Sequence, residues 1–376
     1  MTVPCHIGNF HYHSTEKSAK RTKRNKENLR RNRQLTCLTV RAALFLARHE
    51  RGKPVSGEKT DMKKIMSVML ACLASVLLLD ACGKENEKET LFLKPDADMR
   101  GGYDLQELDL AELGIGNPGG ICIYDDSIYI CDLSNNCIVK LGMDLAREDS
   151  FGTLGMEEGN FSEPRDITFA DGCFYVLDEG NNRVQKFTSD FEYLEMYYLH
   201  PPYAQMTGKY VSIAVDAEGI VYVSMISPDP MDAYIFAYKE DTWEKIGDKV
   251  VGYLCAGEES MYFVNTLEMN IAEKVTEVRS GENMLYELDK KGISLIARID
   301  NKYAPTALAC WNGSIYMVSA ATGEVNCFSY ESDNFATLFA VPEGAHSLDM
   351  HMSIDTAGNI YISDCENGCL YFAEKQ

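Results

Sequence analysis

Short runs of alternating apolar and polar residues, separated by turn residues, fill the chain from about residue 103 to its end. The clearest unit spans residues 161–187. In it, a first alternating run is followed by Asp171-Gly172, a strong signal for a two-residue hairpin turn. A second run ends in Gly and Asn residues, which tolerate the positive φ of a reversal, and a third begins at Arg183. The pattern predicts consecutive antiparallel strands.

A tyrosine flanked by two apolar residues recurs six times, each time in a predicted second strand. The spacings are 46, 47, 40, 54 and 45 residues, and the six residues are Tyr129, Tyr175, Tyr222, Tyr262, Tyr316 and Tyr361. A period in the 40s with about four short strands per unit is typical of radial β repetition, in which each sheet is buried by its neighbours. We therefore predict an all-β fold, a six-bladed β-propeller with four-stranded blades.

The second blade also carries a family resemblance. Its residues Pro164, Ile167, Tyr175-Val176, Asp178 and Asn181–Phe187 resemble an NHL repeat. The match fades elsewhere: Cys137 and Cys369 replace the Arg of the repeat, and blades three to five lack its Asp. NHL-type propellers include scaffolds, carbohydrate or protein binders and a few lyases, so the resemblance implies the fold and leaves the function open.

Closure of the ring requires a strand from outside the last repeat, because the chain ends after the third strand of blade six. Residues 103–110 alternate with period two and precede the first full blade. We predict that they form the outer strand of blade six, because a propeller avoids an open edge between its first and last blades. The propeller domain is then residues 102–376.

The residues before the propeller predict where the protein is located in the cell. Met62-Lys63-Lys64, an apolar stretch and the run Leu79–Cys82 resemble a bacterial lipoprotein signal peptide over residues 62–81, with lipidation at Cys82. Residues 1–61 are then an over-extended reading frame, expected to be disordered, and residues 82–101 a flexible tether. The alternative for residues 1–61 is a basic arm that binds nucleic acid. The alternative for the apolar stretch is a buried helix. The protein is predicted to be exported and lipid-anchored in the bacterial cell envelope, facing either the periplasm or the cell surface.

The net charge of the mature chain, residues 82–376, limits the classes of partner that the protein is expected to bind. Residues 82–376 contain 20 Lys+Arg against 51 Asp+Glu, a formal net charge of −31. The electric field of this negative charge repels nucleic acid and anionic membrane surfaces. The predicted contact with the membrane is therefore through the lipid on Cys82 alone.

Candidate ligand-binding residues follow from the repeat. Residues that open the third strands, and residues just before the apolar part of the first strands, should line the mouth of the axial channel. The set is Asp166, Arg183, Ser212, Tyr234, Met284, Glu324 and His351. It could hold a polar ligand by charge-assisted hydrogen bonds and stacking, with Arg183 paired to Asp166, to Glu324 or to a ligand carboxylate. The alternative is that these are ordinary polar side chains of a wet channel.

Two long loops are predicted on the same face, over residues 226–232 and 265–283. Loops of this length in a compact domain are usually functional or disordered, so a polysaccharide, peptide or protein partner is expected there. The alternative is that the length of these loops has drifted without any functional role.

The leading functional prediction is a non-catalytic binding or scaffold module for a glycan or peptide. The alternative is a metal-dependent lyase or lactonase that uses the channel. Only three histidines follow Cys82, so a His-rich metal site is disfavoured, although oxygen ligands from Asp166 and Glu324 are conceivable. No serine elbow or phosphate-binding glycine loop is present in the sequence, so no catalytic residue, metal site or cofactor is assigned.

Three repeated carboxylates, Asp132, Asp178 and Asp364, are interpreted as braces of turns. Nine cysteines follow Cys82. Those in first strands, Cys122, Cys255 and Cys310, are interpreted as small buried hydrophobes. The pairs Cys131 with Cys137 and Cys365 with Cys369 flank one kind of turn; free thiols, hairpin disulfides and a four-thiolate zinc site are all open.

Overall fold

The computed structural model describes residues 90–96, 99–199, 209–226, 233–248, 252–265, 283–290, 292–300, 303–329, 334–342, 347 and 349–376. The chain divides into two units at residues 1–86 and 87–376, and the described residues all belong to the second unit. No helix within them is long and apolar enough to cross a membrane. The predicted signal peptide, Cys82 and residues 1–61 lie outside the described residues.

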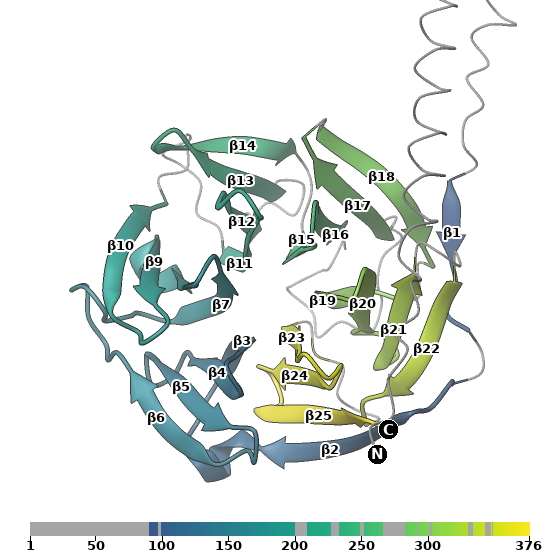
Figure 1. The fold of residues 1–376 in the computed structure, drawn as a ribbon, viewed down its shortest axis with the longest axis horizontal. Coiled ribbons are helices and arrows are strands. Elements are labelled where there is room, and N and C mark those ends of the chain that lie inside the picture. The colour runs from purple at the N-terminus through teal and green to yellow at the C-terminus, as the bar shows by residue number, and fades with distance from the viewer. Residues whose placement is uncertain are drawn as a thin grey trace, which may run out of the picture. The chain divides into compact units, whose positions relative to one another are not determined.

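The described residues form a six-bladed β-propeller, as predicted (Figure 1). Each blade has four antiparallel strands, and in blades 1 to 5 these four strands lie next to one another in their chain order. Blade 1 comprises β3 (Pro118–Tyr124), β4 (Ser127–Asp132), β5 (Cys137–Gly142) and β6 (Arg147–Phe151). Blade 2 comprises β7 (Pro164–Ala170), β8 (Cys173–Asp178), β9 (Arg183–Thr188) and β10 (Tyr193–Tyr198). Blade 3 comprises β11 (Lys209–Val215), β12 (Val221–Ile226), β13 (Ala233–Lys239) and β14 (Thr242–Asp248).

Blades 4 and 5 follow the same plan, whereas blade 6 takes its outer strand from the residues before blade 1. Blade 4 comprises β15 (Gly252–Ala256), β16 (Met261–Asn265), β17 (Asn283–Asp289) and β18 (Gly292–Ile299). Blade 5 comprises β19 (Pro305–Trp311), β20 (Ser314–Ser319), β21 (Glu324–Ser329) and β22 (Asn334–Ala340). Blade 6 comprises β23 (Met350–Ile354), β24 (Ile360–Asp364), β25 (Cys369–Lys375) and β2 (Tyr103–Asp109).

The closing strand is the predicted one. Strand β2 pairs antiparallel with β25 along its whole length, from Tyr103 opposite Lys375 to Asp109 opposite Cys369. In Figure 1 the two strands lie side by side although they come from opposite ends of the propeller domain. A short 3-10 helix, η2 (Leu110–Leu113), then leads into blade 1.

Turn chemistry explains the hairpins. Asp171 and Gly172 have φ angles of 49° and 72°, the backbone that a two-residue turn requires between strands of right-handed twist. Asn182 follows the 3-10 helix η3 (Glu179–Asn181) and has φ 50°, so it ends the turn between β8 and β9 in a left-handed conformation. The predicted roles of these turn residues are therefore confirmed.

The core lies between blades rather than within one sheet. In the described residues, buried apolar side chains form six clusters, one at each junction of neighbouring blades. The repeated tyrosine of the second strand belongs to these junctions: Tyr175 is 1% exposed and Tyr361 is 1% exposed. Each sheet thus buries its faces against its two neighbours, which is why the repeat length could predict the fold.

One segment differs from the prediction of a flexible tether. Strand β1 (Leu91–Leu93) pairs in parallel with β18 at the outer edge of blade 4, and Leu93 is 1% exposed in the core between blades 4 and 5. The backbone N–H groups of Asp96 and Arg100 donate to carbonyls of β22. Of the apolar triplet at residues 91–93, Leu93 supplies the burial, whereas Phe92 is 59% exposed.

Candidate functional site

The six inner strands β3, β7, β11, β15, β19 and β23 surround the centre of the propeller (Figure 1) and line a channel of about 230 Å³. This volume is below the roughly 300–1,000 Å³ of pockets that enclose drug-sized ligands. The channel therefore suits one sugar ring or one amino-acid side chain of a larger ligand. Three of its polar side chains, Asp166, Tyr253 and His351, lie within the first three positions of their strands.

Asp166, the third residue of β7, links three blades at this end of the channel. Its Oδ1 accepts a hydrogen bond from the N–H of Ile167, and its Oδ2 accepts one from the N–H of Ile213 in blade 3, both at 2.9 Å. A Cβ atom at Gly120 in blade 1 would lie 2.1 Å from Oδ1 of Asp166. Glycine at this position leaves the space that the buried carboxylate occupies.

His351, on β23, is the central cation of the site and is 5% exposed. Its Nδ1 lies 3.3 Å from Oδ1 of Asp166, and its Nε2 lies 3.4 Å from Oδ1 of Asp349. Burial lowers the pKa of His351, but the two carboxylates outweigh burial and raise the pKa to about 9. The ring is therefore an imidazolium at neutral pH, with both nitrogens as donors.

The Nε2 donor of His351 has no hydrogen-bond partner among the described atoms, because its contact with Asp349 has an ion-pair distance without hydrogen-bond geometry. A buried donor of this kind costs free energy unless a partner satisfies it. His351 is among the residues that line the channel, and its Nε2 atom is buried.

Arg165 forms ion pairs with two acidic residues close to His351. The guanidinium donates from Nη1 to Asp349 at 2.6 Å and from Nε to Glu179 at 2.8 Å. Burial raises the pKa of Asp349, but His351 and Arg165 outweigh it and hold that pKa below its usual range. The cluster of Arg165, Asp166, Glu179, Asp349 and His351 thus holds two cations against three carboxylates.

Neutral donors and acceptors lie near the charged cluster, and two of their residues, Ser212 and Tyr253, line the channel. Thr306 Oγ1 donates to the hydroxyl of Tyr253 at 3.2 Å, and the Tyr253 ring meets the His351 ring edge to face at 6.1 Å. Ser212 accepts from the N–H of Leu254 at 3.2 Å, which ties blade 3 to blade 4. Burial raises the pKa of Tyr253 well above its usual value, so its hydroxyl stays neutral.

The structure brings together three of the seven predicted ligand-binding residues. Asp166, Ser212 and His351 line the channel. Arg183, Tyr234, Met284 and Glu324 are not among the lining residues: Tyr234 packs under Lys245, Met284 accepts from the hydroxyl of Tyr286, and Glu324 accepts from Thr322. The reason is geometric, because third strands lie two strands away from the axis.

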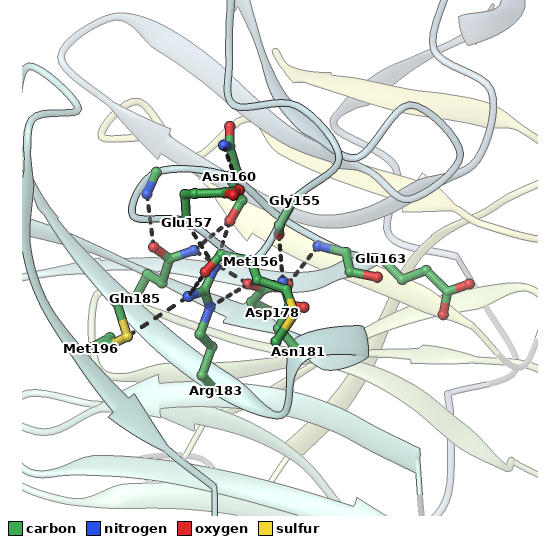
Figure 2. Close-up of polar contacts among 12 residues, drawn as sticks. Gly155, Met156, Glu157, Asn160, Glu163, Asp178, Asn181, Arg183, Gln185 and Met196 are labelled. Atoms are coloured by element: carbon green, nitrogen blue, oxygen red, sulfur yellow. Dashed lines mark hydrogen bonds and ion pairs between the residues drawn. The ribbon is translucent and has the colours of Figure 1, made fainter.

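Arg183 has a structural role that differs from its predicted role (Figure 2). It is 1% exposed, and its Nε donates to Asp178 at 2.7 Å rather than to Asp166 or Glu324. Its two terminal nitrogens donate to three carbonyls of the preceding connection, at Met156, Glu157 and Asn160. Every side of the guanidinium in Figure 2 thus faces the protein, and the residue holds the loop between blades 1 and 2.

The repeated aspartates brace turns, as predicted. Asp178 accepts from the N–H of Ser162 at 2.7 Å and from the side chain of Asn181 at 2.9 Å. Asp132 and Asp364 accept in the same way from the asparagine three residues later, in each case from both its backbone and its side-chain N–H.

All nine described cysteines are free thiols, and among the described residues no three or more His, Cys, Asp or Glu side chains are arranged to hold a metal ion. Cys122 and Cys255 are buried, as interpreted, but Cys310 is only half-buried and faces the channel. The two long loops predicted at this face lie almost wholly outside the described residues.

Sequence reasoning missed Arg165, Glu179, Asp349, Tyr253 and Thr306. The first three adjoin residues that were singled out: Arg165 precedes Asp166, Glu179 follows Asp178, and Asp349 lies two positions before His351. Tyr253 and Thr306 each occupy the second position of an inner strand, as His351 does. An alignment on the starts of the first strands would have found them.

Comparison with known proteins supports the fold. Residues 161–187 match the NHL repeat. No curated protein matches the chain in sequence. Among solved structures, virginiamycin B lyase from Staphylococcus aureus is similar with a TM-score of 0.50 and 13% identity, over 72% of this chain and 99% of the lyase. A luciferin-regenerating enzyme is similar with a TM-score of 0.51 and 11% identity, over 72% of this chain and 95% of that enzyme. At such identities the likeness concerns the fold alone; the chain is a six-bladed β-propeller with an NHL repeat.

Proposed function

We propose that the chain is a lipid-anchored binding module of the cell envelope, whose propeller channel holds a polar group of a glycan or peptide. The observation that carries this proposal is His351, a buried cation that lines the channel and whose Nε2 donor has no hydrogen-bond partner among the described atoms. A cationic donor at a fixed position can bind a ligand oxygen without any change in protonation.

The charge balance favours hydroxyl groups. The imidazolium of His351 offers a donor, and Asp166, which also lines the channel, offers carboxylate lone pairs beside it. A hydroxyl both donates and accepts, so a sugar ring matches this alternation better than an anion would. The three carboxylates and two cations of the cluster also leave no excess positive charge to attract a ligand carboxylate. We therefore favour a glycan over a peptide.

The catalytic alternative has weaker support. A histidine held protonated by two carboxylates is a poor general base at neutral pH. Both oxygens of Asp166 already accept backbone N–H groups, and Glu324 is not among the channel-lining residues, so the oxygen-ligand metal site considered from the sequence is not assembled by these residues. Metal analysis of the purified chain tests this point: a stoichiometric divalent ion that Asp166→Ala abolishes would support the lyase or lactonase alternative.

Binding is tested with glycan and peptide arrays probed with the full chain, followed by titration of the glycan that binds. His351→Gln should weaken binding by about 10-fold to 100-fold, because it removes a charged hydrogen bond. Thr168→Ala is the matched control, since Thr168 lines the same channel two residues after Asp166. It should leave affinity within about threefold. Unchanged binding by His351→Gln, or greater loss in the control, would contradict the proposed site.

The proposed anchor is tested separately. Expression from Met62 in a bacterial host with labelled fatty acid should tag the protein, and Cys82→Ala should remove the tag, because thioether attachment needs that thiol. Cys122→Ala, which lacks a signal-like sequence before it, should keep the tag. Labelling that survives Cys82→Ala would refute the lipid attachment but leave the channel site unaffected.

A further inference from the structure

Two cysteines from neighbouring blades meet on the wall of the channel. Cys255 lies on β15, the inner strand of blade 4, and Cys310 lies on β19, the inner strand of blade 5. Their sulfur atoms are 2.7 Å apart, and both residues line the channel. The sulfur of Cys122, a third cysteine that lines the channel, contacts the backbone carbonyl of Ile123 instead.

We propose that Cys255 and Cys310 form a disulfide that joins blades 4 and 5 across the channel wall when the protein meets an oxidising disulfide. The two strands are already neighbours in the ring and share the apolar cluster between blades 4 and 5. The sulfurs therefore need only a small approach to reach bonding distance. The bond would link residues 55 positions apart in the chain.

The difference in burial between the two thiols sets the order of the reaction. Cys310 is half-buried and open to the channel, whereas Cys255 is buried. Burial and the neighbouring Cys310 raise the pKa of Cys255 well above its usual value. Cys310 is thus the better attacking group, because the thiolate is the nucleophile in exchange.

The reaction consumes one external disulfide. The thiolate of Cys310 attacks one sulfur of that disulfide, whose S–S bond breaks and whose other half leaves and takes up a proton. The sulfur of Cys255 then loses its proton, attacks the sulfur of Cys310 and expels the second half as a thiol. Two protein thiols are oxidised to one disulfide, and the external disulfide is reduced to two thiols.

Closing a loop of this length restricts the unfolded chain more than the folded one, so the oxidised protein should be more stable. The bond also fixes the distance between two inner strands of the channel. This inference does not depend on the proposed function, because it rests on a different part of the wall from the His351 cluster.

The test oxidises the folded full chain with cystamine, a small disulfide, alkylates the remaining thiols and maps the linked peptides by mass spectrometry without reduction. We expect a link between Cys255 and Cys310, and a Tm higher by on the order of 5 °C than that of the reduced chain. Cys310→Ser should lose both effects. Cys122→Ser, which changes another channel cysteine, should keep both.

The linkage is read on the unmodified chain, so the result does not depend on whether a variant folds. Should Cys310→Ser fold poorly, Cys255→Ala removes the other partner and must lose the link equally. The proposal would be overturned if, after cystamine treatment of the folded chain, both thiols were still free and became alkylated. It would also be overturned if either thiol formed its disulfide with Cys122.

Discussion

Deletion of residues 102–110 is expected to open the ring of the propeller. The deletion removes β2, whose seven residues pair with β25 from Tyr103 to Asp109, and it exposes the backbone of β25 as an edge. It also removes Leu105 and Leu108, which pack in the clusters on the two sides of blade 6. We expect the Tm to fall by on the order of 10 °C or more and the protein to aggregate, because an open edge invites pairing with another chain.

Deletion of residues 1–61 is the control for this experiment. It removes a longer segment, but that segment belongs to the unit separate from the propeller, so thermal melting should change little. Both chains are compared by calorimetry and light scattering at the same concentration. A 102–110 deletion that melts with the parent and stays monomeric would show that β2 does not close the ring in solution.

The second large effect is expected for Arg183→Ala. This substitution leaves the carboxylate of Asp178 buried without its cation and leaves three carbonyls of the loop between blades 1 and 2 without their donor. Burial already raises the pKa of Asp178 despite the arginine, which shows how strongly the site disfavours an unpaired charge. Loss of one partner of a buried ion pair typically destabilises by about 3–5 kcal/mol.

Equilibrium unfolding in urea measures this effect. Arg100→Ala is the matched control, because Arg100 forms an exposed ion pair with Asp96 at 3.4 Å and its side chain is 54% exposed. It should cost less than about 1 kcal/mol. The pair Arg183→Met with Asp178→Asn should be less destabilised than the sum of the single changes. A stable Arg183→Ala variant that loses ligand binding would restore Arg183 to the binding site.

The fold was predictable because its information is local and repeated. The tyrosine spacing gave the number of blades, Asp171-Gly172 gave a hairpin, and the alternation at residues 103–110 gave the closing strand. Strand β1 was not predicted, because three apolar residues in a polar segment carry no periodic signal.

The site was predictable only in part. Position in the repeat located Asp166, Ser212 and His351, because first strands line the axis of any propeller. The same reasoning misplaced Arg183, since a conspicuous cation in an acidic chain can equally satisfy a buried carboxylate. Pairings between blades, such as Arg165 with Asp349, join residues 184 positions apart and leave no trace in the spacing of the sequence.

The protonation state of His351 tests most directly whether the channel holds a fixed cationic donor. An NMR titration of the imidazole resonances of the full chain, with His351→Gln to assign the signal, should give a pKa of about 9, so that the ring is charged at pH 7. Asp166→Asn should lower that pKa, because it removes the negative charge nearest to Nδ1. A pKa at or below the ordinary value of 6.5 would contradict our account, since a neutral imidazole could act as a base and would not be the fixed cationic donor of a binding site.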